Sequence, residues 1–182
     1  FEADAGTMFN ARVRSEDGEM DTFMNIRTPE GYYLSYDDDS GYGYDPEVLN
    51  IMLSESGAYT LAILPASINT RGEFELEIVQ TPPAVFECDR SQTIIFDNKR
   101  VQAPYKMDVK ANDNIHMAFV PTDGNAATLN INVTLNGEYF AYYYADSTMP
   151  QLSADIEAPF SGELLFTISD YLYRRHEFTV NI

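Results

Sequence analysis

The stretch EFELEI at residues 73–78 decides the fold class of this chain. Phe74, Leu76 and Ile78 alternate with glutamates, so an extended strand here has one apolar face and one charged face. The stretch AYTLAI at residues 58–63 repeats the pattern. Short runs of this kind, rich in Val, Ile, Phe, Tyr and Thr, are separated along the chain by Gly, Pro, Asn and Asp. Because no segment keeps a helical period with start and stop signals, the sequence predicts an all-β fold.

Composition narrows the class of protein further. The chain has 182 residues, 45% of them hydrophobic, and a formal charge of −18. The apolar content is too high for a disordered acidic polymer, and the charge disfavours binding to nucleic acid or insertion into an anionic membrane. Cys88 is the single cysteine, so the chain has no internal disulfide and no cysteine-based metal centre.

Three pairs of stretches indicate an internal repeat. NIRTPEGYY at 25–33 aligns with NVTLNGEYF at 132–140, SGAYTL at 56–61 with SGELLF at 161–166, and EFELEI at 73–78 with EFTVNI at 177–182. The segment QTPPA at 80–84 lies between the copies, and its two prolines favour an extended linker. We therefore predict two tandem jelly-roll-like antiparallel β-sandwich modules, at residues 1–80 and 84–182.

The two copies differ at their beginnings. Residues 85–107, which include the strand-like QTIIF at 92–96, have no counterpart in the first copy. Residue 1 is Phe rather than Met, so we expect the chain to be part of a longer polypeptide. We also expect the first module to lack its opening strands, leaving an edge near Phe1 that upstream residues or another chain would fill.

Four motifs in the first copy carry a family resemblance. They are DTFM at 21–24 leading to PEG at 29–31, DDDSGYGYD at 37–45, SGAYT at 56–60 and GEFEL at 72–76. In order and spacing they resemble the bacterial pre-peptidase C-terminal (PPC) domain family, whereas the second copy has ADS at 145–147 in place of the aspartate triplet. The resemblance implies a small β-sandwich appended to a secreted peptidase or another exported protein, located outside the cytoplasm, with calcium bound in some relatives.

The aspartate-rich loop is the first candidate site. Three adjacent carboxylates repel one another unless they are solvated, separately hydrogen-bonded or shared with a cation. Calcium accepts six to eight oxygen ligands in irregular geometry, which Asp37, Asp39 and Asp45 would supply, joined by Asp21 if its strand lies beside the loop. The alternative is that these carboxylates accept hydrogen bonds from backbone N–H groups in a tight connection.

Tyrosines form the second candidate site. Tyr33, Tyr42 and Tyr44 in the first module and Tyr143 in the second are candidates for contacting a glycan or a protein surface. The alternative is that these rings only pack against neighbouring strands as cross-strand pairs.

The sequence offers little for catalysis. His116 and His176 are the only histidines, and no nucleophile elbow, zinc-protease pair or phosphate-binding loop is present. We therefore predict a noncatalytic binding or stabilising appendage of an exported protein. A structural spacer of a surface protein is the main alternative, and a glycan-processing enzyme with an Asp/Glu pair is a third.

Overall fold

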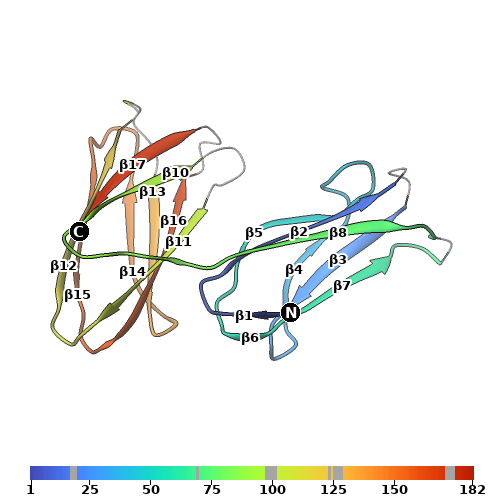
Figure 1. Ribbon diagram of the computed structural model, residues 1–182, viewed down its shortest axis with the longest axis horizontal. Helices are drawn as coiled ribbons and strands as arrows, with labels where there is room; N and C mark the ends of the chain where they lie inside the picture. The colour runs from blue at the N-terminus through green and yellow to red at the C-terminus, as the bar shows by residue number, and fades with distance from the viewer. Residues whose placement is uncertain (17–19, 69, 97–101, 123, 125–128, 171–174) are drawn as a thin grey trace. The chain divides into compact units, whose positions relative to one another are not determined.

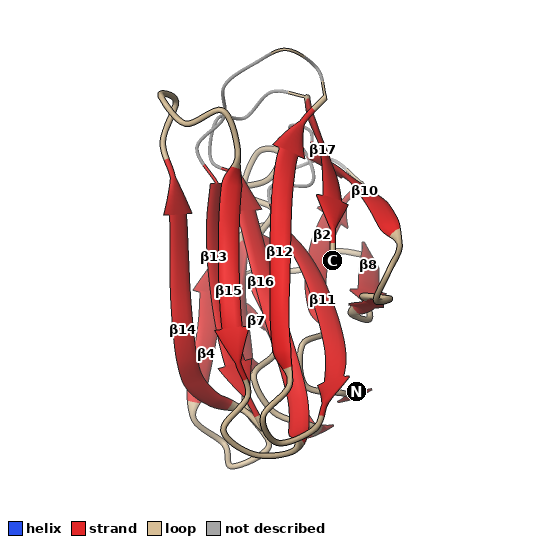
Figure 2. Cartoon of the chain, turned by 90° about the vertical axis from the view of Figure 1, so that its left-hand side faces the viewer, coloured by secondary structure: helices blue, strands red, loops and turns tan. Residues whose placement is uncertain are grey.

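The computed structural model describes residues 1–16, 20–68, 70–96, 102–122, 124, 129–170 and 175–182. Every regular element in these residues is a β-strand, which confirms the all-β prediction (Figure 2). The chain divides into two compact units, Phe1–Pro82 and Pro83–Ile182. None of the described elements is a helix long and apolar enough to cross a membrane.

The first unit is a sandwich of two three-stranded sheets, ordered β5-β2-β8 and β4-β3-β7 (Figure 1). A two-residue pair, β1 with β6, lies beside them, and all pairs in this unit are antiparallel. The strands are β1 (Glu2–Ala3), β2 (Met8–Ser15), β3 (Thr22–Arg27), β4 (Tyr33–Asp37), β5 (Glu47–Met52), β6 (Gly57–Ala58), β7 (Thr60–Pro65) and β8 (Phe74–Thr81).

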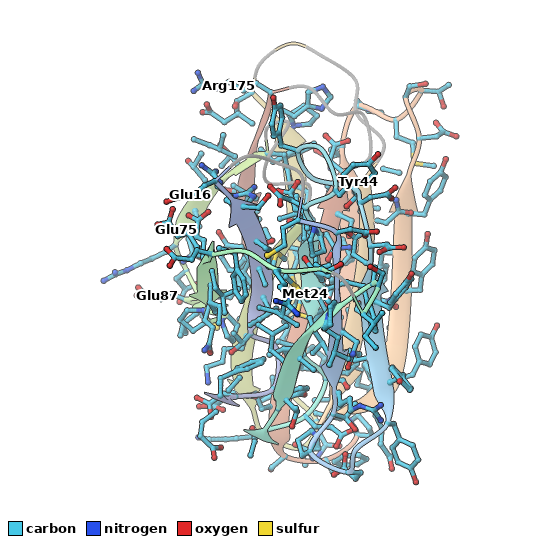
Figure 3. All side chains as sticks on the ribbon, turned by 90° about the vertical axis from the view of Figure 1, so that its right-hand side faces the viewer. Glu16, Met24, Tyr44, Glu75, Glu87 and Arg175 are labelled. Carbon is cyan, nitrogen blue, oxygen red and sulfur yellow. The ribbon has the colours of Figure 1, made fainter. Side chains whose placement is uncertain are left out.

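The core of the first unit follows from strand alternation. Every second side chain of β2 and β3 points inward, because successive residues of a strand face opposite sides of the sheet. The buried cluster consists of Phe9, Ala11, Val13, Met24, Ile26, Val48, Leu53 and Tyr59. Met24 lies in this core (Figure 3).

The second unit is a larger sandwich with sheet orders β10-β17-β12-β15 and β14-β13-β16-β11-β9. Its pairs are antiparallel except for β9 with β11, which is parallel. The strands, most of which are labelled in Figure 2, are β9 (Ala84–Val85), β10 (Ser91–Phe96), β11 (Gln102–Val109), β12 (Asn114–Pro121), β13 (Leu129–Leu135), β14 (Glu138–Ala145), β15 (Leu152–Glu157), β16 (Gly162–Asp170) and β17 (His176–Asn181). Among the described residues, its buried cluster has 24 hydrophobic residues, whereas that of the first unit has eight.

Two expectations about the first unit require correction. The edge near Phe1 is paired, because Glu2 lies opposite Ala58 and the Phe1 carbonyl accepts a hydrogen bond from the Tyr59 amide, 2.8 Å away. The expectation that the first module lacks its opening strands is not overturned, because within the described residues no strand pairs with β8 as β10 pairs with β17.

Residues 73–78 form a strand with one apolar and one charged face, and the apolar side chains would be expected to be buried. They lie on the same face as the buried Val13 and Ala11 of β2, but all eight residues of β8 are exposed. The alternation at residues 73–78 shows which side chains share one face of the strand, but it does not show whether a neighbouring strand covers that face.

Candidate functional site

The outer face of β3 and β4 carries the strongest candidate site. Met24 and Ile26 point into the core, so Phe23, Asn25 and Arg27 point outward from β3. The pairing of β3 with β4 places Tyr36 opposite Asn25 and Tyr33 opposite Arg27, with a bulge between Ile26 and Arg27. The register therefore gathers three aromatic rings, an amide and a guanidinium on one surface.

These side chains surround an open depression of about 490 Å³. Its lining includes Phe23, Asn25, Tyr33 and Tyr36. The Phe23 and Tyr36 rings are tilted against each other with centroids 6.1 Å apart, and the Arg27 guanidinium lies 3.9 Å from the centroid of the Tyr33 ring. Tyr33 and Tyr36 are 67% and 60% exposed, so their rings offer solvent-accessible aromatic surface beside the depression.

Asn25 lines this depression and has an unsatisfied polar atom. Its side chain is 3% exposed, and within the described part of the chain its Oδ1 atom has no hydrogen-bond partner. A buried acceptor without a partner costs free energy, so such groups in folded proteins call for an explanation. Here the atom belongs to a residue that lines an aromatic depression.

The Tyr36 hydroxyl also faces the acidic loop. It donates a hydrogen bond to Asp38 Oδ2 at 3.4 Å. Desolvation raises the pKa of Tyr36 above its usual value, and the Asp38 carboxylate raises it further. The phenol is therefore a neutral hydrogen-bond donor throughout the physiological pH range.

The candidate metal ligands Asp37 and Asp45 accept hydrogen bonds from protein groups. Asp37 Oδ2 accepts from the amides of Ser40 at 3.2 Å and Glu47 at 2.7 Å. Asp45 Oδ1, in a buried side chain, accepts from the Ser15 amide at 3.0 Å and its hydroxyl at 2.7 Å. These contacts match the alternative in which the carboxylates organise a tight connection.

Asp39 and Asp21 are placed differently. Asp39 is exposed, and Asp21 directly precedes β3, where its backbone carbonyl accepts a hydrogen bond from Ala66. Within the described residues no group of three or more His, Cys, Asp or Glu side chains is arranged to hold a metal ion. Calcium binding by this loop stays a prediction.

The four candidate tyrosines do not form one surface. Tyr33 borders the β3–β4 depression, whereas Tyr42 and Tyr44 are exposed on the connection between β4 and β5 (Tyr44 is labelled in Figure 3). Tyr42 also lines a separate depression of about 450 Å³ together with Asp45.

Tyr143 lies in the second unit and faces inward. It is paired with Ile131 and packs against the core, and its hydroxyl donates to the Asp155 carbonyl at 2.7 Å. Burial raises the pKa of Tyr143. Its neighbours Tyr142 and Tyr144 are the ones that project outward, because side chains alternate along β14.

Sequence reasoning missed Phe23, Asn25 and Tyr36 as site residues. The alternation of TFMNIR at 22–27 does place Phe23 and Asn25 on one face, so part of the signal was present. The opposing Tyr36 depends on the register and the bulge between β3 and β4, which the sequence pattern does not reveal.

Comparison with known proteins gives only distant structural likenesses. No protein-family model matches the sequence, and no curated protein matches it. The pre-peptidase C-terminal domain of a collagenase from Bacillus anthracis aligns at 13% identity with a TM-score of 0.47, covering 56% of this chain and 96% of that one.

Two other solved structures include carbohydrate-binding modules by name. One is the M60 catalytic domain with the CBM51-1 and CBM51-2 domains from Clostridium perfringens ZmpB, at 11% identity and a TM-score of 0.34, covering 98% of this chain and 31% of that one. The other is the CBM22-1–CBM22-2 tandem of Xyn10C from Paenibacillus barcinonensis, at 13% identity and a TM-score of 0.28. This alignment covers 98% of this chain and 78% of that one. At these values the likenesses carry no argument about function.

Proposed function

We propose that this chain is a noncatalytic binding module of an exported protein and that its first unit binds a neutral glycan on the outer face of β3 and β4. The observation that carries the proposal is the depression bordered by Phe23, Tyr33 and Tyr36, whose lining also includes Asn25, a residue with a buried, unpartnered Oδ1. The PPC-like motifs of the first copy support an extracytoplasmic, appended module of this kind.

A sugar ring fits this surface chemically. Its C–H faces are apolar and pack on exposed aromatic rings, while its hydroxyls can donate to the Asn25 oxygen and to the Tyr36 hydroxyl oxygen, whose own hydrogen is donated to Asp38. The acidic loop that follows β4 lies next in sequence to Tyr36, and the chain carries a formal charge of −18. Electrostatic repulsion therefore favours a neutral glycan over an acidic one.

The proposal is tested by titrating the chain with soluble cellohexaose, xylohexaose and chitohexaose in a calorimeter. At least one should bind, and Tyr33→Ala, Tyr36→Ala and Asn25→Ala should each weaken it about tenfold or more, because side chains that anchor a ligand contribute about 1.4 kcal/mol or more. Tyr32→Ala is the matched control, since this neighbouring ring is also highly exposed but does not line the depression.

Three outcomes would contradict the proposal. They are no binding of any neutral oligosaccharide, equal weakening by the Tyr32 control, and preferential binding of polygalacturonic acid. The first would favour a structural spacer. Cleavage of a bound oligosaccharide would instead favour the enzymatic alternative.

A further inference from the structure

The first unit is open along one side of its sandwich. In the described part of the chain, β8 pairs only with β2 and β7 pairs only with β3, so each has one free edge. The second unit has matching pairs, since Val13 lies opposite Leu76 and Phe119 lies opposite Val180. There, however, β10 pairs with the corresponding edge of β17, and β11 pairs with β16.

The missing cover leaves apolar side chains in solvent. Leu76 and Ile78 share the inward face with the buried Val13 and Ala11, yet they are 38% and 41% exposed. In the second unit the corresponding face of β17 is closed, because Ile94 of β10 lies opposite Phe178 and both are buried. The comparison shows which element covers this face: an antiparallel strand with apolar side chains at alternate positions.

The charged side chains on the outward face of β8 determine which charges a partner strand should carry. Glu75 and Glu77 alternate with the apolar residues and are exposed. On the paired edge they lie opposite Arg14 and Arg12 of β2, and the Arg12 guanidinium is 3.5 Å from a Glu77 carboxylate oxygen, so an incoming strand with basic residues would repeat this arrangement on the free edge. Two copies of β8 paired around Leu76 with apolar residues opposite each other would place Glu75 opposite Glu77 of the other copy. Like charges directly opposite destabilise a strand pair, so a second copy fits poorly and a basic strand fits well.

We propose that the free edge of β8 is a docking site for an extended strand of another polypeptide. The strand runs antiparallel to β8, with apolar side chains facing Phe74, Leu76 and Ile78 and Lys or Arg between them. Backbone hydrogen bonds supply affinity, and the alternating apolar and basic pattern supplies specificity. The site is separate from the proposed glycan surface.

The test uses a capped synthetic peptide of about nine residues, alternating Lys with Val or Ile, titrated into the full chain by fluorescence anisotropy. It should bind at least about tenfold more tightly than a scrambled peptide of equal charge and than the same peptide with Glu for Lys. N-methylation of the peptide amides on one edge should abolish binding, because those groups pair with β8. Hydrogen exchange should show new protection of β8 amides.

Protein variants locate the site. Glu75→Gln with Glu77→Gln should weaken the basic peptide about tenfold or more, because it removes the carboxylates without placing new positive charges opposite Arg14 and Arg12 of β2. Glu157→Lys, on the edge strand β15 of the second unit, is the matched control and should leave binding unchanged. Equal binding of the scrambled peptide, insensitivity to N-methylation, or concentration-dependent dimers formed through β8 in sedimentation would each overturn the proposal.

Discussion

Asp45 shows how a single carboxylate organises the acidic loop. Its side chain is buried and accepts two hydrogen bonds from Ser15, while its backbone carbonyl accepts one from the Gly41 amide at 2.9 Å. A Cβ atom at Gly41 would lie 2.6 Å from that carbonyl oxygen, so only glycine fits the close approach. The dense run of acidic residues is therefore partly explained by local backbone structure.

Asp45→Ala should lower the free energy of unfolding of the first unit by about 1–3 kcal/mol, because the Ser15 amide loses its acceptor. Asp39→Ala is the matched control, since the Asp39 side chain is exposed, and it should change stability by less than about 0.5 kcal/mol. Urea denaturation in the presence of a chelator measures both. Equal losses in the two variants would show that the Asp45 contacts do not stabilise the loop.

The Asp39→Ala variant also tests whether the acidic loop binds calcium. A melting temperature of the first unit that rises with calcium in the wild type, and rises less in Asp39→Ala, would support the proposed metal site. Identical curves with calcium and with chelator would leave only the structural role of the loop.

At the scale of elements, β8 and β17 show that the same pattern leads to different burial. Phe74 and Phe178 lie at corresponding positions, opposite Ser15 of β2 and Pro121 of β12. Phe74 is 43% exposed and Phe178 is 2% exposed, because β17 is paired on both edges, with β10 and β12, whereas in the described residues β8 is paired only with β2.

Phe178→Ala should therefore destabilise the second unit by about 3–5 kcal/mol, the usual loss for a buried phenylalanine. Phe74→Ala should cost less than about half of that in the first unit, since much of its ring already contacts water. Chemical denaturation of the two variants provides the comparison. Similar losses would mean that β8 is covered in solution.

At the scale of the whole molecule, the two units have unequal cores. Counting only the residues that the structure describes, the second unit has a buried cluster of 24 hydrophobic residues, whereas the first has eight. Burial of apolar surface is the main favourable contribution to folding. Because the second unit buries more apolar side chains, we expect it to fold alone more readily than the first.

A fragment of residues 83–182 should therefore unfold cooperatively on heating, at a temperature above that of a fragment of residues 1–82. Circular dichroism and calorimetry of the two fragments measure this. If the 83–182 fragment remained unfolded under conditions where the full chain is folded, the second unit would not be independently stable and this prediction would be wrong.

The sequence by itself determined the strands and the faces of this protein. The alternation at residues 73–78 and 22–27 assigns each side chain to one side of a strand, because the two-residue period is a local property of an extended backbone. Tertiary structure alone decided which faces are covered and which side chains meet. Phe74 is exposed because burial depends on a neighbouring strand, and Asn25 lies opposite Tyr36 because the register and bulge of β3 and β4 bring them together.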